Sequence, residues 1–432
     1  MPQPVPTPIP AGLLYRPADL AGLAFETTAD LAPLPGLIGQ PRAHEAIRFG
    51  TGIAHRGFNI FAIGAGGARM QESIRALLDD AAPGRPQPPD WVYVNNFAAP
   101  HRPVAISLPG GQAPVLEKAV HTLVDDLRSA LPAVFAGEDY QKRRAALEQS
   151  IQARHESGFT ALNEKATAHN IAVLRTPMGF AMAPTRDGKV VPPADFNAWP
   201  EAEQQATRAA IEELEKDLEQ TLRTIPRLEK EQRDAVRALD RETARFALAQ
   251  PFEEAKAPFT ALPAVMAQFD AMLADILDNV GLFIAAEAAE PAALAAAGRL
   301  GGPFDRYEVN VLVTQADHGA GAPVIEELHP TLGNLVGRIE YLQMQGALVT
   351  NFRLIKPGAL HRANGGTILI DARSLLTEPF SWTALKRALL RQQITIEDVA
   401  RFVGLTTTVS LEPDPIPLDV KVVLFGDRQL YY

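Results

Sequence analysis

The sequence predicts an α/β fold in which a parallel sheet is interrupted by a long antiparallel coiled coil. Three observations predict it. Residues 367–371 form a short apolar run that follows two glycines and ends in an acid, Asp371. An apolar segment at residues 58–63 runs into a glycine-rich turn, and helical periodicity fills residues 139–168 and 201–249. Short continuous apolar runs are typical of strands buried on both faces, so we assign them to a parallel sheet.

Helices and strands alternate at the start of the chain. Residues 39–55 predict a helix, residues 58–63 a strand, and the glycine-rich turn leads into a helix that ends near residue 78. Residues 91–95 predict a second strand. This order is typical of the beginning of an α/β nucleotide-binding module, which we assign to residues 1–110.

The middle of the chain, residues 111–290, predicts a helical insertion. A helix at residues 115–131 precedes the two coiled-coil arms, and Pro226 should kink the second arm. Charged residues border the apolar stripe of that arm, which comprises Ile211, Leu214, Leu218, Leu222 and Ile225. We expect residues 139–249 to project from the α/β core and to be removable without unfolding it.

A small β-structure is predicted at the tip of the coiled coil, residues 171–191, where Asp187-Gly188 joins short strands. Met178, Phe180 and Met182 are candidates for contacting unfolded substrate chains. The alternative is that they pack the tip's own core. We favour packing, because so small a sheet needs the apolar residues it has.

The second part of the α/β module occupies residues 291–432, after a helical return over residues 259–285. Its predicted elements are strands at residues 307–313, 352–355 and 367–371, a helix at 382–390, a hairpin between 394–396 and 407–411, and a last strand at 420–425.

The turn after the first strand resembles a phosphate-binding loop that has lost its working residues. Gly64 and Gly67 are kept. Arg69, Met70 and Gln71 stand where such a loop has glycine, the phosphate-binding lysine and the magnesium-binding hydroxyl. Arg69 could serve as a displaced cation, and the plainer interpretation is a glycine-rich turn between strand and helix.

The strand that ends at Asp371 resembles a Walker B strand, whose carboxylate holds the Mg²⁺ of a bound nucleotide. An AAA+ ATPase normally has Glu next, to orient the attacking water, and this chain has Ala372. Asp427 follows the last predicted strand. In AAA+ modules this is the position of the sensor 1 residue, which is usually Asn or Thr. We therefore expect ATP and Mg²⁺ to bind weakly or not at all.

The composition limits the partners open to the chain. A net charge of −10 over 432 residues argues against a nucleic-acid partner or an anionic membrane surface. The chain has no cysteine, which excludes thiolate chemistry and suits a cytoplasmic protein. We expect neither a secretory signal nor a membrane span, and the nine histidines have no metal-binding spacing.

The C-terminal third resembles the AAA+ part of the Lon-related proteases, in the subgroup with a long helical insertion. The resemblance rests on residues 330–340, 346–350, 356–366 and 409–421. It implies a homo-hexameric ring joined to a serine peptidase domain with a Ser–Lys dyad. A branch with decayed nucleotide motifs resembles the chain best, which implies degradation of unfolded proteins without ATP. The chain ends just after the last predicted strand, so we expect a fragment with no catalytic residue of its own.

Three charged or polar side chains in the resembling segments are candidate functional residues. His361 could line the passage for substrate, and the plainer interpretation is a structural loop histidine. Arg338 and Arg362 could act as charge clamps across a subunit interface, or form ion pairs with Glu340 or Asp371.

Three functions remain open. The first is the substrate-gating, ring-forming part of a Lon-type serine protease. The second is an active ATPase motor of an ATP-dependent protease or helicase-like machine, against which the replaced nucleotide residues argue. The third is a non-enzymatic scaffold built on an inactive AAA+ fold.

Overall fold

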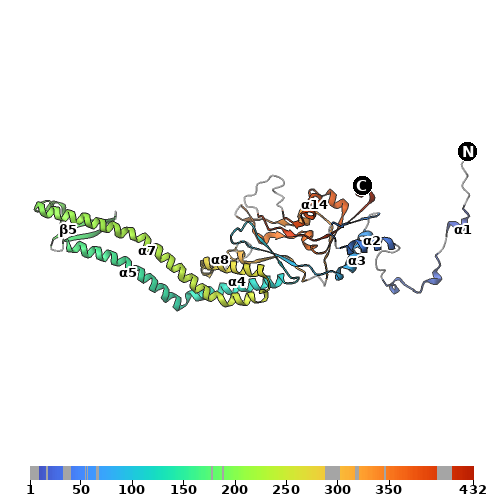
Figure 1. Ribbon diagram of the computed structural model, residues 1–432, viewed down its shortest axis with the longest axis horizontal. Coiled ribbons are helices and arrows are strands. Elements are labelled where there is room, and N and C mark those ends of the chain that lie inside the picture. Colours follow the sequence, from blue (N-terminus) through green and yellow to red (C-terminus); the bar gives the residue numbers. More distant parts are fainter. Residues whose placement is uncertain are drawn as a thin grey trace.

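The computed structural model describes residues 9–15, 18–32, 40–53, 55, 57–64, 68–176, 179–186, 189–287, 302–316, 321–344, 347–396 and 411–432. Figure 1 shows an α/β body, a long two-helix arm on one side of it, and an N-terminal segment with helix α1 (Ala11–Leu14) on the other. None of the described helices is long and apolar enough to cross a membrane.

The body contains a four-stranded parallel sheet. Its order is β1 (Ile60–Ile63), β16 (Lys421–Gly426), β13 (Thr367–Asp371) and β8 (Val324–Glu327), and every neighbouring pair is parallel. This confirms the parallel sheet that the apolar runs predict.

Alternate residues of β13 enter two different cores, because successive side chains of a strand point to opposite faces. Leu369 packs toward α2 (Pro41–Gly52) and α3 (Ala68–Ala81), whereas Ile368 and Ile370 pack on the other side. The helices on that second side are α11 (Leu332–Val336), α12 (Ala359–Arg362), α13 (Ala372–Thr377) and α14 (Ser381–Arg391). Both faces of the strand are buried from solvent, which explains why its sequence is apolar at consecutive positions.

A second sheet in the body is antiparallel, with the order β3 (Val104–Leu108), β2 (Asp90–Val94) and β7 (Val309–Val313). The sequence assigns residues 91–95 to the nucleotide-binding module, and the structure instead makes β2 the central strand of this separate sheet. Val92 and Val94 pack against the root of the arm, and Tyr93 packs on the opposite face. The partners of β2 come from distant segments, so its own sequence does not specify them.

The root of the arm and the second sheet share the largest core of the protein. The helices of this core are α4 (Ala113–Ala136), the root end of α7 (Glu201–Lys256), α8 (Pro263–Asp278) and α9 (Val280–Glu287). Asp90, fully buried, joins the two: its carboxylate accepts hydrogen bonds from the backbone N–H groups of Ala113, at 2.8 Å, and Gln315, at 2.7 Å. These charge-assisted bonds fix the start of α4 on the sheet.

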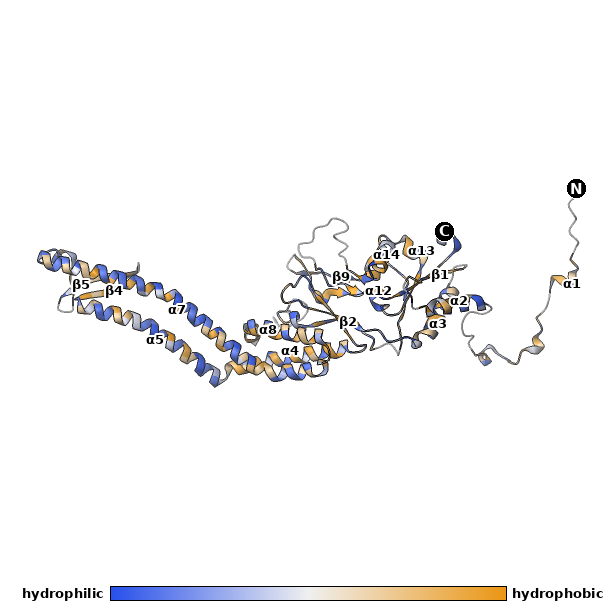
Figure 2. Cartoon of the chain, viewed as in Figure 1, coloured by the Kyte–Doolittle hydropathy of each residue, from blue (hydrophilic) through white to orange (hydrophobic). Residues whose placement is uncertain are grey.

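The arm is an antiparallel pair, α5 (Glu138–Ala168) and α7. Three ion pairs tie the two helices: Arg143–Glu242 at 3.0 Å, Arg154–Glu231 at 3.2 Å and Lys165–Asp217 at 2.7 Å. Helix α7 has 56 residues and is continuous through Pro226, where the sequence predicts a kink. Figure 2 shows hydrophilic and hydrophobic residues mixed along both helices.

Two separate cores hold the arm. The tip core comprises Leu162, Ala166, Ile171, Leu214 and Leu218, under a sheet of β4 (Ile171–Thr176), β5 (Gly179–Arg186) and β6 (Lys189–Val190). This tip sheet agrees with the predicted β-structure. No residue between Leu218 and Leu239 of α7 is buried, and Leu239, Ala244 and Leu248 belong to the root core. A removable arm therefore ends before Leu239, and the expectation that it extends to residue 249 is wrong.

Smaller elements complete the body and tip. The predicted strand at residues 352–355 is a 3-10 turn, Phe352–Leu354, followed by β12 (Ile355–Lys356), which pairs with β9 (Arg338–Ile339). The predicted hairpin falls mostly on residues 397–410, outside the described residues. The remaining short elements are β10 (Leu342–Met344), β11 (Ala347–Val349), β14 (Gln393–Ile394), β15 (Ile416–Pro417), α6 (Pro193–Phe196) and α16 (Arg428–Tyr431).

Candidate functional site

Three of the predicted site residues meet at the carboxyl edge of the parallel sheet. Gly64 follows β1, Asp371 ends β13 and Asp427 follows β16. The register pairs Ile63 with Gly426, and the N–H of Gly64 donates to the carbonyl oxygen of Gly426 at 3.1 Å. This is the edge where open α/β sheets bind ligands.

The carboxylate of Asp371 is used to begin a helix. Its Oδ1 accepts hydrogen bonds from the backbone N–H of Ser374, at 2.7 Å, and from the Ser374 hydroxyl, at 3.0 Å. This is the N-cap arrangement that satisfies an otherwise unpaired donor of α13. The next residue, Ala372, is buried, so no side chain at this position reaches toward a nucleotide.

Asp427 caps a second helix. Its Oδ1 accepts from the backbone N–H groups of Gln429 and Leu430, and its Oδ2 accepts from Arg373 at 2.7 Å. The Leu430 N–H first, and then Arg373, hold the pKa of the Asp427 carboxyl below its usual value. Both candidate carboxylates are therefore bound to groups of their own chain.

Met70 occupies the position of the phosphate-binding lysine and points inward. It packs on the core formed by Ile74, Leu369 and Val423. A Cβ added to Gly64 would lie 2.6 Å from the Met70 sulfur, so the thioether covers the glycine. Arg69 lies in α3, but its side chain is outside the described residues, and so is Gly67.

Apolar groups also crowd the end of β16. A Cβ added to Gly426 would lie 3.2 Å from Leu430 and 3.4 Å from the Cβ of Ala372. The rings of Phe61 and Tyr431 meet edge to face at 5.3 Å. The chain's own side chains therefore occupy the space at the carboxyl edge of the parallel sheet. No cluster of three or more His, Asp or Glu that could hold a metal occurs in the described part of the chain.

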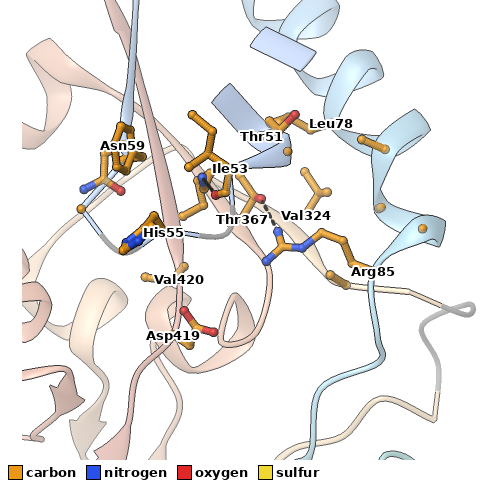
Figure 3. A pocket seen from close by; sticks show the side chains of 18 of the residues that line it. Thr51, Ile53, His55, Asn59, Leu78, Arg85, Val324, Thr367, Asp419 and Val420 are labelled. Carbon is orange, nitrogen blue, oxygen red and sulfur yellow. Dashed lines mark hydrogen bonds between the residues drawn. The ribbon is translucent and has the colours of Figure 1, made fainter. Parts of the chain in front are cut away.

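A cavity of about 650 Å³ lies at the opposite, amino edge of the same sheet (Figure 3). It is bordered by Asn59 before β1, Val324 in β8, Thr367 in β13 and Val420 before β16. Open α/β sheets bind ligands at the other edge, so the phosphate-loop position and this cavity are two different places.

His361 is buried in the body, with 2% of its surface exposed. Its Nδ1 accepts a hydrogen bond from the N–H of Gly358 at 3.1 Å, and burial lowers the pKa of the imidazole to about 3. Gly358 lies so close to the backbone of Gly337 and Leu335 that a Cβ would collide with both. The candidate role in lining a substrate passage is therefore wrong for this fold, because the ring is enclosed and neutral.

Both candidate interface arginines form ion pairs within the chain. Arg338 pairs with Glu340 at 2.8 Å, as one of the alternatives predicts. Arg362 pairs with Glu327 at 3.1 Å rather than with Asp371. Each guanidinium keeps about half of its side-chain surface exposed, 50% and 47%, so a contact to another subunit stays a prediction.

At the tip, two of the three predicted substrate contacts can be placed. Met182 packs on the tip core, which is the alternative favoured from the sequence. Phe180 is 36% exposed and stacks on Phe159 with ring centroids 5.5 Å apart. The two phenylalanines border an open groove of about 600 Å³. Met178 lies outside the described residues.

Arg85 and Lys421, which line the amino-edge cavity, were not singled out as site residues from the sequence. Arg85 lies in a proline-rich connection, and Lys421 is the last residue of a segment that carries the family resemblance, where it begins an ordinary strand. Only the folding of β16 beside the end of α3 brings them together, so no local signal marks them.

Comparison with known proteins matches two parts of the chain to Lon-related families. Residues 320–432 match the family described as LonB-like, AAA domain, and residues 90–123 match the Lon-like LonC helical domain. A protein of Escherichia coli (strain K12), named as a Lon protease homolog, is 33% identical over 75 residues. That match covers 17% of this chain and 12% of the relative.

A crystal structure of NtrX from Brucella abortus matches 26% of this chain and 22% of its own, with 20% sequence identity and a TM-score of 0.16. At this level of similarity it carries no argument about fold or function.

Proposed function

Because the chain is a Lon-related protein with Lon-like AAA and helical parts, we propose that it is the substrate-gating part of a Lon-type serine protease. In this proposal the parent protein is a cytoplasmic homo-hexamer that degrades unfolded proteins without hydrolysing ATP. A peptidase part outside these 432 residues would supply a serine nucleophile activated by a lysine.

The main support for the proposal is the arrangement of side chains at the carboxyl edge of the parallel sheet. Gly64, Asp371 and Asp427 lie at the carboxyl ends of neighbouring parallel strands, but Asp371 and Asp427 cap helices and Met70 packs on the apolar core. A hydrolytic site needs a cation on the phosphates and a group that orients water. An architectural role would keep such strands while dispensing with both groups.

The arm supports the gating role. Its tip has a core of its own and an open groove beside Phe159 and Phe180. Figure 1 shows this tip far from the body. Unfolded polypeptides expose apolar side chains, and aromatic residues give such side chains large contact areas. A projecting tip of this kind would contact an unfolded substrate before the substrate reaches the peptidase part of the parent protein.

The test of ATP independence combines calorimetry with degradation. We expect titration of this chain with Mg·ATP to give no saturable heat at micromolar concentrations, because no lysine cradles the phosphates. We also expect the full-length parent to cleave an unstructured protein at the same rate with and without nucleotide. A variant with serine replaced in the peptidase part controls for contaminating proteases. Micromolar binding accompanied by ATP turnover would refute the proposal and point to the active-motor alternative.

A further inference from the structure

The cavity at the amino edge of the parallel sheet contains two cations with few partners. Its walls come from the C-terminal ends of α2 and α3, the segment after each, and the beginnings of β8, β13 and β16. Figure 3 shows Arg85 extending from the segment after α3 across the cavity toward Thr367. The site is therefore built from both parts of the α/β module.

Arg85 has almost no acceptor. Its Nη1 donates one long hydrogen bond, 3.4 Å, to the hydroxyl of Thr367, and none of the ion pairs in the described part of the chain involves Arg85. A guanidinium has five N–H donors in a planar fork. Most of these donors are free to bind a ligand in the cavity.

Lys421, at the start of β16, is a second cation in the lining of the cavity and is 9% exposed. Its ammonium donates to the carbonyl oxygens of Gly50, at 2.8 Å, and Ile53, at 2.6 Å, at the end of α2. Burial first, and then the nearby Arg85, lower the pKa of this ammonium. Among the described residues that line the cavity, Asp419 is the only carboxylate, and it is exposed to solvent.

We propose that this cavity binds a small organic anion, with a carboxylate or phosphate group held by Arg85 beside Lys421 and an apolar portion against the cavity wall. Neither cation forms an ion pair with a carboxylate among the described residues, although Asp419 acts on Lys421 through space. A charge with little access to solvent is stabilised by a partner of opposite sign, which applies to Lys421 more than to the half-buried Arg85. The planar fork of arginine matches both carboxylate and phosphate oxygens.

The rest of the cavity fits the apolar portion. Ile53, Leu78, Val324, Leu418 and Val420 line it. Its volume of about 650 Å³ lies within the range of small-molecule sites. The site is independent of the proposed protease function and lies away from the phosphate-loop position, so either proposal can fail alone.

Isothermal titration of this chain with inorganic phosphate and with hexanoate, at constant ionic strength, tests the proposal. We expect saturable binding of at least one probe. Arg85→Gln should weaken that binding about tenfold or more, and Arg85→Lys less, because lysine keeps the charge but not the fork. Arg42→Gln removes an exposed arginine of α2 that does not line the cavity and should leave the affinity unchanged.

The two probes distinguish the source of the anionic group. Tighter binding of hexanoate indicates an apolar carboxylate, and tighter binding of phosphate indicates a phosphate ester. Thermal melts of each variant check that it is folded, which we expect because Arg85 makes one long hydrogen bond. The proposal is overturned if neither probe binds saturably up to about 10 mM, or if Arg85→Gln binds as the wild type does.

Discussion

Met70 and His361 are two residues of the predicted motifs whose side chains lie inside the α/β body. At the position of a phosphate-binding lysine, Met70 joins the apolar core. His361 is surrounded by the closely approaching backbones of Gly337 and Gly358, and its neutral form accepts one backbone hydrogen bond. Both side chains lie inside the fold: Met70 packs on the apolar core, and the enclosed His361 ring has a buried Nε2 without a hydrogen-bond partner among the described residues.

His361 should make the stability of the body depend on pH. Its pKa of about 3 in the folded protein is below the ordinary value of 6.5, so the fold favours the neutral ring. This stabilisation is complete above pH 6.5 and is lost as the pH falls from 6.5 toward 3, at up to about 1.4 kcal/mol per pH unit. Between pH 7.5 and 5, the wild type should lose about 2 kcal/mol more unfolding free energy than His361→Gln.

Urea unfolding at a series of pH values measures this difference. His101→Gln, at an exposed position, is the matched control for replacing a histidine. Parallel pH profiles for the wild type and His361→Gln would contradict the assignment of a buried neutral imidazole.

At the scale of elements, α7 belongs to two cores with a thinly packed stretch between them. Leu214 and Leu218 contribute to the tip core, and Leu239 and Leu248 to the root core. The ion pair between Arg154 and Glu231 lies in the intervening stretch, where the Arg154 side chain is 61% exposed and the Glu231 side chain 38% exposed. Exposed pairs of this kind contribute little stability, so the two cores should unfold separately.

Leu218→Asp should unfold the tip and spare the root. Leu218 is 8% exposed, and a carboxylate there would lie in an apolar core without a partner. Leu222→Asp, on the same predicted stripe, is the control, because Leu222 is 38% exposed. In hydrogen exchange, we expect Leu218→Asp to remove protection from residues 159–218 and retain it in β2 and α4. Loss of protection in β2 as well would show that the arm and body unfold as one unit.

For the whole molecule, the arm extends the reach of the body. An α-helix of 56 residues is about 84 Å long, well beyond the dimensions of the sheets. Its root is fixed to the body by the shared core and by the hydrogen bonds of Asp90 to α4 and to Gln315, just after β7. Because the root is rigidly packed, the position of the tip relative to a ring of subunits would be set by the body.

Replacing residues 144–238 with a short glycine-containing turn should shorten the arm without disturbing its root. The design keeps the ion pair Arg143–Glu242, the hydrogen bond of Tyr140 to Asp240, and Leu239. In the full-length parent we expect loss of unfolded-protein cleavage while short-peptide cleavage is retained, since peptides need no capture. Melting of the body measured by circular dichroism is the control for folding. Unchanged cleavage of both substrates would remove the gating role.

The sequence by itself determined the elements whose residues act locally. The strand at β13 could be predicted because burial on both faces requires apolar side chains at consecutive positions. The arm could be predicted because its stripe repeats with helical spacing, and the loss of the phosphate-binding lysine can be seen in the sequence itself, at Met70. Gly64, Asp371 and Asp427 each end or follow a strand, and they lie at one edge of the sheet because neighbouring parallel strands end at the same edge.

Only the tertiary structure decided which distant segments meet. In the structure β2 lies in an antiparallel sheet, and Arg362 forms its ion pair with Glu327 instead of Asp371. The loop residue His361 is buried. The tertiary structure also ended the removable arm before Leu239 and brought Arg85 beside Lys421 in one cavity. The physical reason is the same in each case: burial and ion pairing depend on the partner that a segment meets, and a local sequence does not encode a partner far away along the chain.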